Sequence, residues 1–470
     1  MLKSAALGGM SLAAGAAQRP NILFAISDDQ SWLHTSAGGD PVVRTPAFDR
    51  VARSGVRFTH AFSCAPSCTP SRGAILTGQD IWRLEHGANL WSTLDKKFDV
   101  YPDLLEAAGY QVGFSGKGWS PGDFKPGGRT RNPAGPQFKN FREFHASLDK
   151  NKPFCYWFGS FRPHRDYPLN SGLAAGLRPD KVTVPPWIPD VPVVRDDMLD
   201  YFLAIQKWDQ ELADILGVID SASQFDNTLI IATSDNGMPF PRAKATVYDS
   251  GLRMPLAISW PARFKGGRVI DDMVSAIDYA PTILEAAGLK PAPAMTGRSL
   301  MNVLLSDKSG RVDGQRTAIY GAMERHALCR TNKLGYPMRA MRTYDYLYIR
   351  NFEPDRGPAG VAEGYGYGEI DNSPTKSFVL ENKDTEKYGR FFRISCANRP
   401  AEELYDLKKD PAQLNNVAAE RAYAKAKKDM ASRLEARLRA TRDPRIVGGD
   451  IIWDTIPHSG GGDRLPDRKK

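Results

Sequence analysis

The chain has 470 residues, 41% hydrophobic and 25% charged, so it can bury a large core and does not have the composition of a disordered protein. Its formal net charge is +9, but lysine and arginine are scattered, which favours a basic cleft for a small anion over a nucleic-acid surface. Five cysteines without a CxxC pair exclude a disulfide scaffold and a zinc module of that type.

The first residues are small and apolar, with Lys3 in front and an Ala-Gly-Ala run at residues 14–16 behind. This pattern predicts an export signal at residues 1–17, too short to span a membrane, and it is also similar to the end of a twin-arginine signal. No other run is long and apolar enough for a membrane span. We therefore expect an exported protein, periplasmic or extracellular.

From residue 19 to residue 315, short apolar runs alternate with amphipathic segments. Strands are predicted at residues 21–27, 56–59, 112–115, 153–160 and 228–233. Helices are predicted at residues 46–55, 101–108 and 200–220. The alternation predicts an α/β domain with a large, mixed but mostly parallel sheet flanked by helices. Polar residues follow several strands, at the edge where open α/β sheets place their sites.

After residue 315 the pattern changes. Residues 344–350 and 403–407 predict strands rich in aromatic and aliphatic side chains, and residues 418–441 predict a charged amphipathic helix. We expect a smaller C-terminal domain at residues 316–445, an antiparallel sheet with a helix. A loose tail is expected at residues 446–470, where three glycines follow one another.

One short run, Cys-Thr-Pro-Ser-Arg at residues 68–72, carries a specific pattern. Pro70 fits the first turn of a helix, which would place Cys68 at the helix N-terminus, where backbone N–H groups and the helix dipole favour an anion. Arg72 would then lie one turn away on the same face. A cysteine before a helix is more often an inert buried thiol, so the local pattern alone leaves both interpretations open.

The same run, followed by a helix of small residues and Leu-Thr-Gly at residues 76–78, resembles the signature of the type I sulfatases, which share the alkaline phosphatase fold. The resemblance implies that a maturation enzyme oxidises Cys68 to formylglycine, whose hydrated aldehyde attacks sulfur. A geminal diol can attack with one oxygen and expel sulfate by collapse of the other. A thiol or a simple hydroxyl would stay sulfated.

Two polar pairs follow predicted strands: Asp28 with Asp29, and Asp235 with Asn236. Each pair alone is a common turn sequence. In the family that the chain resembles, matching pairs bind calcium, and three carboxylates with one amide oxygen form a hard donor set that suits Ca²⁺, with Mg²⁺ as the alternative. The resemblance therefore implies a calcium site formed by these four residues.

Three cationic or titratable residues match further family groups. Lys117, in a Gly-Lys-Gly run, matches a lysine that contacts the sulfate, and Lys244 matches the basic residue downstream of the second polar pair. With Arg72 they would cradle the sulfate oxygens. His164 matches the last histidine of an H-x-P-H pattern and is expected to protonate the leaving group.

Within the family, the sulfamidases, or heparan N-sulfatases, look closest, because residues 234–241 and 336–339 resemble their motifs. N-sulfated glucosamine is therefore the first expected substrate, and an O-sulfate of another glycan is the alternative. Predicted sugar contacts are His86, Arg325, His326 and Arg339. Trp119 and Phe161 depart from the pattern, because many members have histidine at these positions.

Two other functions are considered. A phosphoester or phosphonate hydrolase shares the fold, but the alkaline phosphatases in that group need more histidines for two transition metals, and the seven histidines here form no H-x-H or H-x-x-x-H cluster. An inactive glycan-binding relative would explain Trp119 and Phe161. It is disfavoured because the whole set of implied catalytic and metal-binding residues is present.

Overall fold

The structure is a computed structural model that describes residues 19–363 and 366–460. The predicted export signal at residues 1–17 lies outside the described residues. Within the described ranges, no helix is both long and apolar enough to cross a bilayer.

The larger of two sheets has eight strands in the order β3-β4-β1-β5-β6-β2-β7, with β8 also paired to β2. The strands are β1 Asn21–Ser27, β2 Val56–Phe62, β3 Gln111–Gly116, β4 Phe154–Gly159, β5 Thr228–Ser234, β6 Arg253–Ser259, β7 Arg268–Ile270 and β8 Val274–Ser275. The four strands β3, β4, β1 and β5 are parallel, whereas β6 is antiparallel to both neighbours. The predicted mixed, mostly parallel sheet is confirmed.

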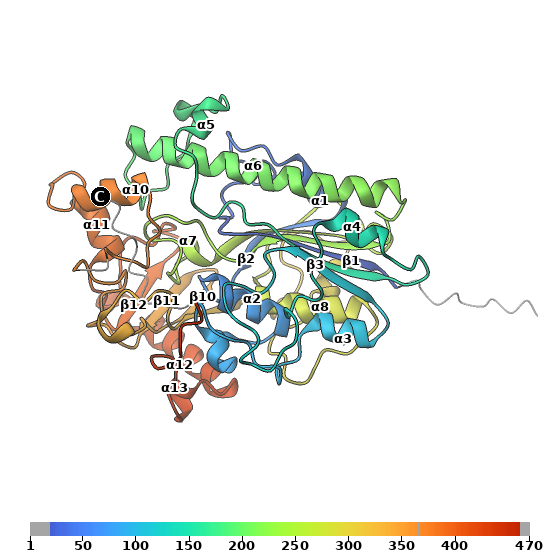
Figure 1. The fold of residues 1–470 in the computed structure, drawn as a ribbon. Helices are drawn as coiled ribbons and strands as arrows, with labels where there is room; N and C mark the ends of the chain where they lie inside the picture. Colours follow the sequence, from blue (N-terminus) through green and yellow to red (C-terminus); the bar gives the residue numbers. More distant parts are fainter. Residues whose placement is uncertain (1–18, 364–365, 461–470) are drawn as a thin grey trace, which may run out of the picture.

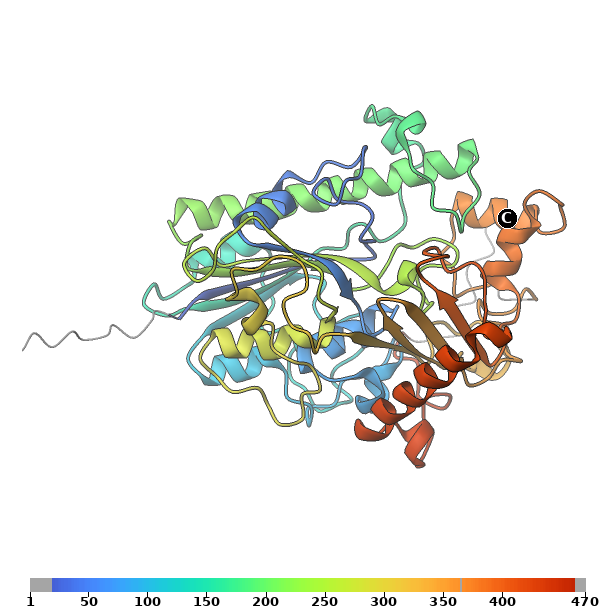
Figure 2. The same cartoon turned by 180° about the vertical axis from the view of Figure 1, so that it is seen from behind.

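Helices cover both faces of this sheet (Figures 1 and 2). One face carries α1 Pro46–Ser54, α4 Phe141–Ala146 and α6 Pro192–Ser221, and the other carries α2 Cys68–Thr77, α3 Tyr101–Ala107 and α8 Tyr279–Ala286. The predicted helix at residues 200–220 is longer than expected, because Pro192 provides a favourable first turn.

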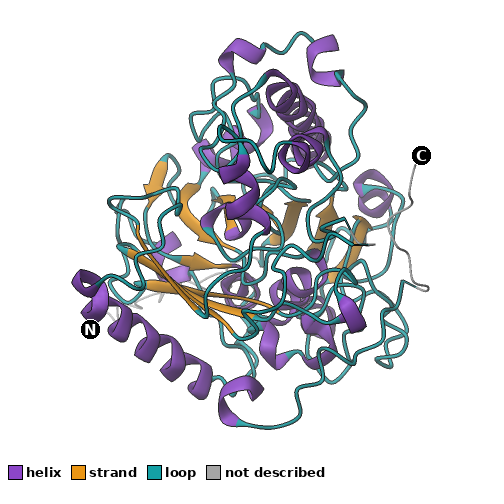
Figure 3. Cartoon of the chain, turned by 90° about the vertical axis from the view of Figure 1, so that its left-hand side faces the viewer, coloured by secondary structure: helices purple, strands orange, loops and turns teal. Residues whose placement is uncertain are grey.

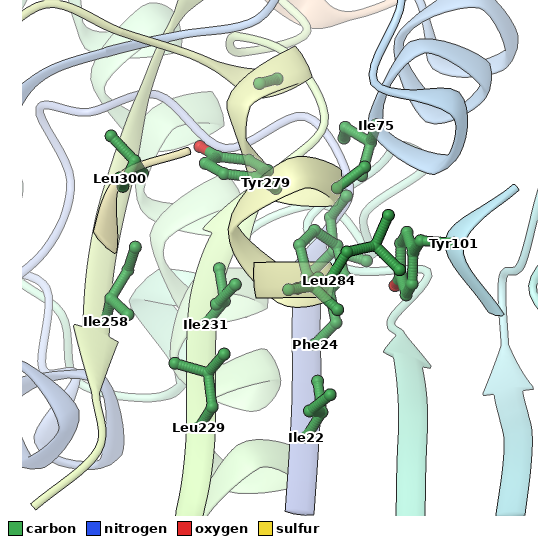
Figure 4. Packing of buried hydrophobic residues seen from close by; sticks show 14 of the residues in the cluster. Ile22, Phe24, Ile75, Tyr101, Leu229, Ile231, Ile258, Tyr279, Leu284 and Leu300 are labelled. Carbon is green, nitrogen blue, oxygen red and sulfur yellow. The ribbon is translucent and has the colours of Figure 1, made fainter. Parts of the chain in front are cut away.

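The side chains of β1 explain how one strand holds both layers. Leu23 and Ala25 pack with α1, α4 and α6, while Ile22, Phe24 and Ile26 pack with α2, α3 and α8. Figure 4 shows Ile22 and Phe24 on the second side. All five are fully buried, and burying one of the larger side chains, leucine, isoleucine or phenylalanine, stabilises the fold by about 1.5–3 kcal/mol. A strand buried on both faces is the expected product of a continuous apolar run.

The smaller sheet has four antiparallel strands in the order β12-β11-β10-β9. They are β9 Ala318–Met323, β10 Met338–Thr343, β11 Tyr346–Asn351 and β12 Glu402–Asp406. One face packs on α12 Ala424–Ala440, and the other joins a hydrophobic cluster with Phe62, Val247 and Leu252 of the larger part. The predicted antiparallel sheet with its helix is confirmed, and the two parts share a core.

Short helices complete the described fold. They are α5 Ser171–Ala174, α7 Asp249–Leu252, α9 Met301–Leu304, α10 Pro374–Glu381, α11 Gly389–Cys396 and α13 Pro444–Val447. Six 3-10 turns also occur: η1 Ile81–Arg83, η2 Glu85–Ala88, η3 Pro179–Lys181, η4 Ala276–Asp278, η5 Thr331–Lys333 and η6 Arg421–Tyr423. The helix predicted at residues 418–441 begins later, at Ala424, directly after η6.

The expectation of a loose tail is wrong for its described part, because residues 453–459 pack against the body of the molecule. Trp453 is buried, and its indole N–H donates to the carbonyl of Glu85 at 2.9 Å. Its own carbonyl accepts from the side chain of Asn89 at 2.8 Å. Only two apolar residues, Trp453 and Ile456, anchor the segment, so no periodic pattern marks it in the sequence. Residues 461–470 lie outside the described ranges.

The sheet register brings distant segments to one edge. Ser27 pairs with Ser234, and Gly159 lies beside both Ile26 and Gly116. The residues that follow β1, β3, β4 and β5 therefore meet at the carboxyl edge of the sheet, which faces the smaller sheet; Figure 3 views the molecule from that side.

Candidate active site

Cys68 is the first residue of α2, and the N-terminus of this helix points at the carboxyl edge of the larger sheet. Ser67 precedes the helix in an extended conformation, and Pro70 lies in the first turn as predicted. The Sγ atom of Cys68 lies 3.6 Å from Oδ1 of Asp28. Burial raises the pKa of the Cys68 thiol well above its usual range.

The four predicted metal ligands lie together and are buried. The backbone N–H of Asp29 donates to Oδ1 of Asp235 at 3.0 Å. The side-chain amide of Asn236 donates to Oδ1 of Asp29 at 2.7 Å. One oxygen of Asp28, one of Asp29 and the Cys68 sulfur lie within 4.8 Å of one another. The ends of β1 and β5 therefore form a single acidic cluster beside Cys68.

Two cations neutralise this cluster from the side of α2 and β3. The Nε atom of Arg72 donates to Oδ2 of Asp235 at 2.8 Å, and its NH1 donates to the carbonyl of Lys117 at 2.7 Å. The Nζ atom of Lys117 lies 2.6 Å and 2.8 Å from the two carboxylate oxygens of Asp28.

The ends of β3 and β4 approach so closely here that a Cβ on Gly159 would lie 1.8 Å from the Lys117 carbonyl oxygen. Glycine at residue 159 is therefore required by space.

Lys244 supplies the third cation and connects the cluster to the outside. Its Nζ atom lies 2.8 Å from Oδ2 of Asp29, 3.1 Å from Nε2 of His164 and 3.0 Å from Oδ2 of Asp371. The Nδ1 atom of His164 lies 2.5 Å from the carbonyl of Arg165, so Nδ1 carries a proton and donates it there. In this arrangement Nε2 of His164 is the atom that faces the cluster.

Burial and the neighbouring charges shift the pKa values of the carboxyl groups in different directions. Burial would raise the pKa of Asp28, but Lys117, His164 and Arg72 together lower it. Burial raises the pKa of Asp235 despite its contact with Arg72. Burial opposes ionisation of Asp371 as well, yet Lys244, His164 and His326 hold its pKa well below the usual range. Asp371 is therefore a carboxylate at neutral pH.

The donor set fits a hard divalent cation. The four predicted ligands offer only oxygen atoms, the ligands that Ca²⁺ and Mg²⁺ prefer. Oδ1 of Asn236 is buried, and it has no hydrogen-bond partner within the part of the chain that the structure describes. A buried amide oxygen without a partner is costly, and a bound cation would satisfy it.

The structure shows two of the predicted sugar contacts buried and paired with protein groups. Arg339 is 0% exposed, and its guanidinium binds Asp443 and Glu324, each at 2.6 Å. Arg325 is buried as well and donates to the carbonyls of Asp454 and Ile456. Both side chains bind the C-terminal segment, so their contact with a sugar stays a prediction that these pairs do not support.

The other two predicted contacts differ from one another. His326 is buried next to the nucleophile position, with Nδ1 2.8 Å from Oγ of Ser67. Burial lowers its pKa below the ordinary value for histidine. His86 lies exposed on η2, and its contact with a sugar stays a prediction.

The two positions that depart from the family pattern have separate structural roles. Trp119 is 1% exposed and belongs to the hydrophobic core on the α2 side of the sheet. Phe161 is 61% exposed after β4, beside a cleft of about 810 Å³ that α4 and α6 also line. Unlike an imidazole, neither the indole of Trp119 nor the phenyl ring of Phe161 can give or take up a proton near neutral pH, so neither ring replaces a histidine as an acid or base.

Asp371 was not among the predicted site residues. It lies in a loop before α10 without hydrophobic periodicity, so no local pattern indicates a site there. It meets Lys244, 127 residues earlier in the chain, only through the tertiary fold.

The sulfatase family model matches residues 20–150 and 133–289, more than half of the chain. The chain belongs to the sulfatase family. As a member it is a sulfuric ester hydrolase, which confirms the resemblance carried by residues 68–78. The model described as "N-sulphoglucosamine sulphohydrolase, C-terminal" matches residues 242–354 of this sulfatase. Formylglycine and a divalent metal are general features of the family.

Curated relatives cover nearly the whole sulfatase. A Formosa agariphila protein named ulvan-active sulfatase is 27% identical, with 91% of this chain and 76% of the relative covered. Human N-sulphoglucosamine sulphohydrolase is 26% identical, with 92% of this chain and 93% of the relative covered. An N-acetylglucosamine-6-O-sulfatase of Bacteroides thetaiotaomicron is 24% identical, with 91% and 87% covered.

Solved structures share the fold. One, described as a complex with its substrate D-glucosamine-2-N,6-O-disulfate, has a TM-score of 0.66 and 20% identity, with 92% of this chain and 100% of that chain covered. The phosphonate monoester hydrolase of Agrobacterium radiobacter has a TM-score of 0.65 and 18% identity, with 90% and 96% covered. Because the fold hosts both chemistries, it does not by itself choose the substrate.

Proposed function

We propose that this sulfatase removes sulfate from a sulfated saccharide, with Cys68, oxidised to formylglycine, as the nucleophile. The observation that carries the proposal is the convergence of Cys68 with two polar pairs and three cations from separate segments of the chain. Residues selected at random from the surface would scatter over the molecule.

The proposed reaction begins with the hydrated aldehyde at residue 68, one oxygen of which takes the place of the Cys68 sulfur. The attacking hydroxyl gives its proton to a carboxylate of the acidic cluster as its oxygen bonds to sulfur, the bond from sulfur to the sugar breaks, and His164 gives a proton to the departing atom. The second hydroxyl then gives its proton to His164, the carbon–oxygen double bond re-forms, and the bond from that carbon to the sulfate oxygen breaks, so that sulfate leaves. Water hydrates the aldehyde again.

Arg72, Lys117 and Lys244 would stabilise negative charge on the sulfate oxygens in the transition state. Asp28, Asp29, Asp235 and Asn236 would hold a divalent cation, with Ca²⁺ as the first choice and Mg²⁺ as the alternative. When bound, that cation would polarise the sulfate. We propose that catalysis is carried by the described residues 19–315, and that residues 316–445 contribute the rim of the pocket.

For the saccharide, we propose N-sulfated glucosamine. The C-terminal family match and the human relative, which is named for that substrate, support this choice. An O-sulfated glycan is the second candidate, because the Formosa and Bacteroides relatives are named as ulvan-active and 6-O-sulfatases.

The apolar segment at residues 1–17 supports the proposal that the enzyme is exported.

The test is peptide mass spectrometry of active enzyme together with sulfate release from defined sugars. We expect formylglycine at residue 68 and no turnover by Cys68→Ala. Cys155→Ala, a buried cysteine outside the cluster, is the matched control and should keep turnover. Full activity with an unmodified Cys68 thiol would contradict the proposal, as would hydrolysis of phosphonate esters without release of sulfate from any sugar.

A further inference from the structure

Asp371 is the outermost acidic group of the cluster. Side-chain exposure increases stepwise along the contact chain, from 0% at Asp29 through 4% at Lys244 to 26% at Asp371. The sulfate has to lie at the buried end, where Cys68 and the three cations meet. The part of the substrate that leaves therefore lies at the open end, against His164 and Asp371.

The loop that carries Asp371 is fixed on both sides. Before it, Glu369 forms a buried ion pair with Arg330 at 2.5 Å. After it, the hydroxyl of Thr375, at the start of α10, donates to Asp197 of α6 at 2.6 Å. Figure 1 shows α10 beside the end of α6 where that helix begins. The carboxylate is thus held at the mouth of the site by packed elements.

One oxygen of Asp371 remains available to a substrate. Oδ2 accepts from Lys244, whereas Oδ1 has no hydrogen-bond partner among the described residues. A carboxylate oxygen at the open end can accept a hydrogen bond from an N–H group or attract a positive charge.

The two candidate leaving groups differ in charge. In sulfamate hydrolysis, R–NH–SO₃⁻ and water give R–NH₃⁺ and SO₄²⁻: the sulfur–nitrogen bond breaks, water oxygen joins sulfur, and both water protons reach nitrogen. In ester hydrolysis, R–O–SO₃⁻ and water give R–OH and HSO₄⁻, and the leaving oxygen gains negative charge until it is protonated. A nearby carboxylate stabilises the first leaving group and opposes the second.

We propose that Asp371 makes this sulfatase selective for a leaving nitrogen, so that sulfamates of amino sugars react in preference to sulfate esters. The inference rests on the proposed function and adds a specificity-determining residue to it. Lys244 screens part of the charge through Oδ2, but the hydrogen-bonding capacity of Oδ1 toward the leaving amine is unaffected.

The experiment measures kcat/KM for N-sulfoglucosamine and for glucosamine 6-O-sulfate. Asp371→Asn should lower the ratio of the N-sulfate to the O-sulfate value about 10- to 100-fold, the range expected for one charged hydrogen bond. Asp371→Glu should recover part of the ratio. Asp384→Asn, an exposed aspartate in the same segment, is the matched control and should leave the ratio unchanged.

Other outcomes separate the inference from the function on which it rests. Equal losses on both sugars in Asp371→Asn would mean that Asp371 only positions Lys244, and would overturn the inference. Wild-type turnover confined to O-sulfates would also overturn it while leaving the proposed function intact. Release of sulfate from no saccharide would overturn the proposed function itself. If Asp371→Asn fails to fold by thermal melting, Asp371→Ser serves the same comparison.

Discussion

The Nε atom of Arg72 lies 2.8 Å from Oδ2 of Asp235, although 163 residues separate them in the chain. The same guanidinium donates to the carbonyls of Lys117 and Gly118 at 2.7 Å and 3.1 Å. One side chain thus joins the N-terminal half of α2 to the ends of β5 and β3. Its planar fork matches these three acceptors, and a lysine ammonium cannot reproduce that geometry.

Arg72→Lys should therefore lower kcat/KM for sulfate release about 100-fold or more, because it loosens the cradle that stabilises the transition state. Steady-state kinetics measures this loss of kcat/KM, and thermal melting measures any accompanying change in the stability of the fold. Arg50→Lys is the matched control, since Arg50 also forms a two-point pair, with Asp220, but on the surface. That control should change little. An Arg72→Lys enzyme with wild-type kcat/KM would remove Arg72 from the mechanism.

Calcium should stabilise the folded protein through the acidic cluster, independently of turnover. A ligand present at 100 times its Kd adds about 2.7 kcal/mol to the free energy of unfolding. Melting of chelator-treated protein, with and without added Ca²⁺, measures this shift. Asn236→Ala should reduce the shift, and Asn302→Ala, an exposed asparagine elsewhere, should not. Equal shifts in both variants would place the cation somewhere else.

Arg339 should affect stability and leave substrate binding unchanged. Its guanidinium is enclosed by Glu324 and Asp443, so Arg339→Met leaves the buried carboxylate of Asp443 without its charged partner, whereas Glu324 keeps its ion pair with Arg445. Breaking a buried pair in this way costs about 3–5 kcal/mol. Chemical denaturation should show that loss, while KM of the folded fraction stays at the wild-type value. Arg350→Met, on a less buried part of the neighbouring strand, is the control. A raised KM with unchanged stability would restore Arg339 as a sugar contact.

The sequence predicted the sheet and the cluster because both depend on local patterns. Continuous apolar runs mark β1 and β5, and the polar residues directly after them lie at the carboxyl edge by necessity. The antiparallel strand β6 was missed. It follows β5 without a crossover helix, since α7 has only four residues, and a connection of that kind suits an antiparallel neighbour.

The placements that the sequence did not anticipate share one physical cause. Arg325 and Arg339 are charged residues near a family motif, and their burial depends on acceptors that lie far away in the chain. Asp371 has the opposite problem, because its importance arises only from the contact with Lys244. Local sequence patterns indicate which residues end a strand, but they do not show which distant partner neutralises a charge.

Acid should destabilise the protein partly through His60. Burial, with Arg253 and Arg342 nearby, lowers the pKa of His60 to about 4, although Asp249 and Asp271 oppose the shift. Between pH 6.5 and pH 4 the unfolded chain binds a proton at this position that the folded protein does not bind, so stability falls as the pH is lowered.

Urea unfolding at pH 7 and at pH 4.5 measures this contribution. Wild-type protein should lose about 1–3 kcal/mol more than His60→Gln between the two pH values, after allowance for the partial exposure of the ring. His86→Gln, on the exposed η2 turn, is the control and should behave as wild type. Identical pH dependence of His60→Gln and wild type would contradict the prediction.

The contribution of His164 to kcat should be larger when the leaving group is poorer. Its Nε2 atom lies 3.1 Å from Nζ of Lys244 and 3.8 Å from Oδ2 of Asp29, so it faces the cluster from the open side. A sugar hydroxyl or amine needs a proton in order to leave, whereas a nitrophenolate does not. His164→Gln should therefore lower kcat about 100- to 10,000-fold for a sugar sulfate, the range expected for one general acid, and much less for 4-nitrophenyl sulfate.

His145→Gln is the control for both substrates, because the ring of His145 binds Gln224 away from the acidic cluster. Equal losses on the sugar sulfate and the aryl sulfate would assign His164 to binding the sulfate, and the proton donor would then have to be sought in Lys244 or His326.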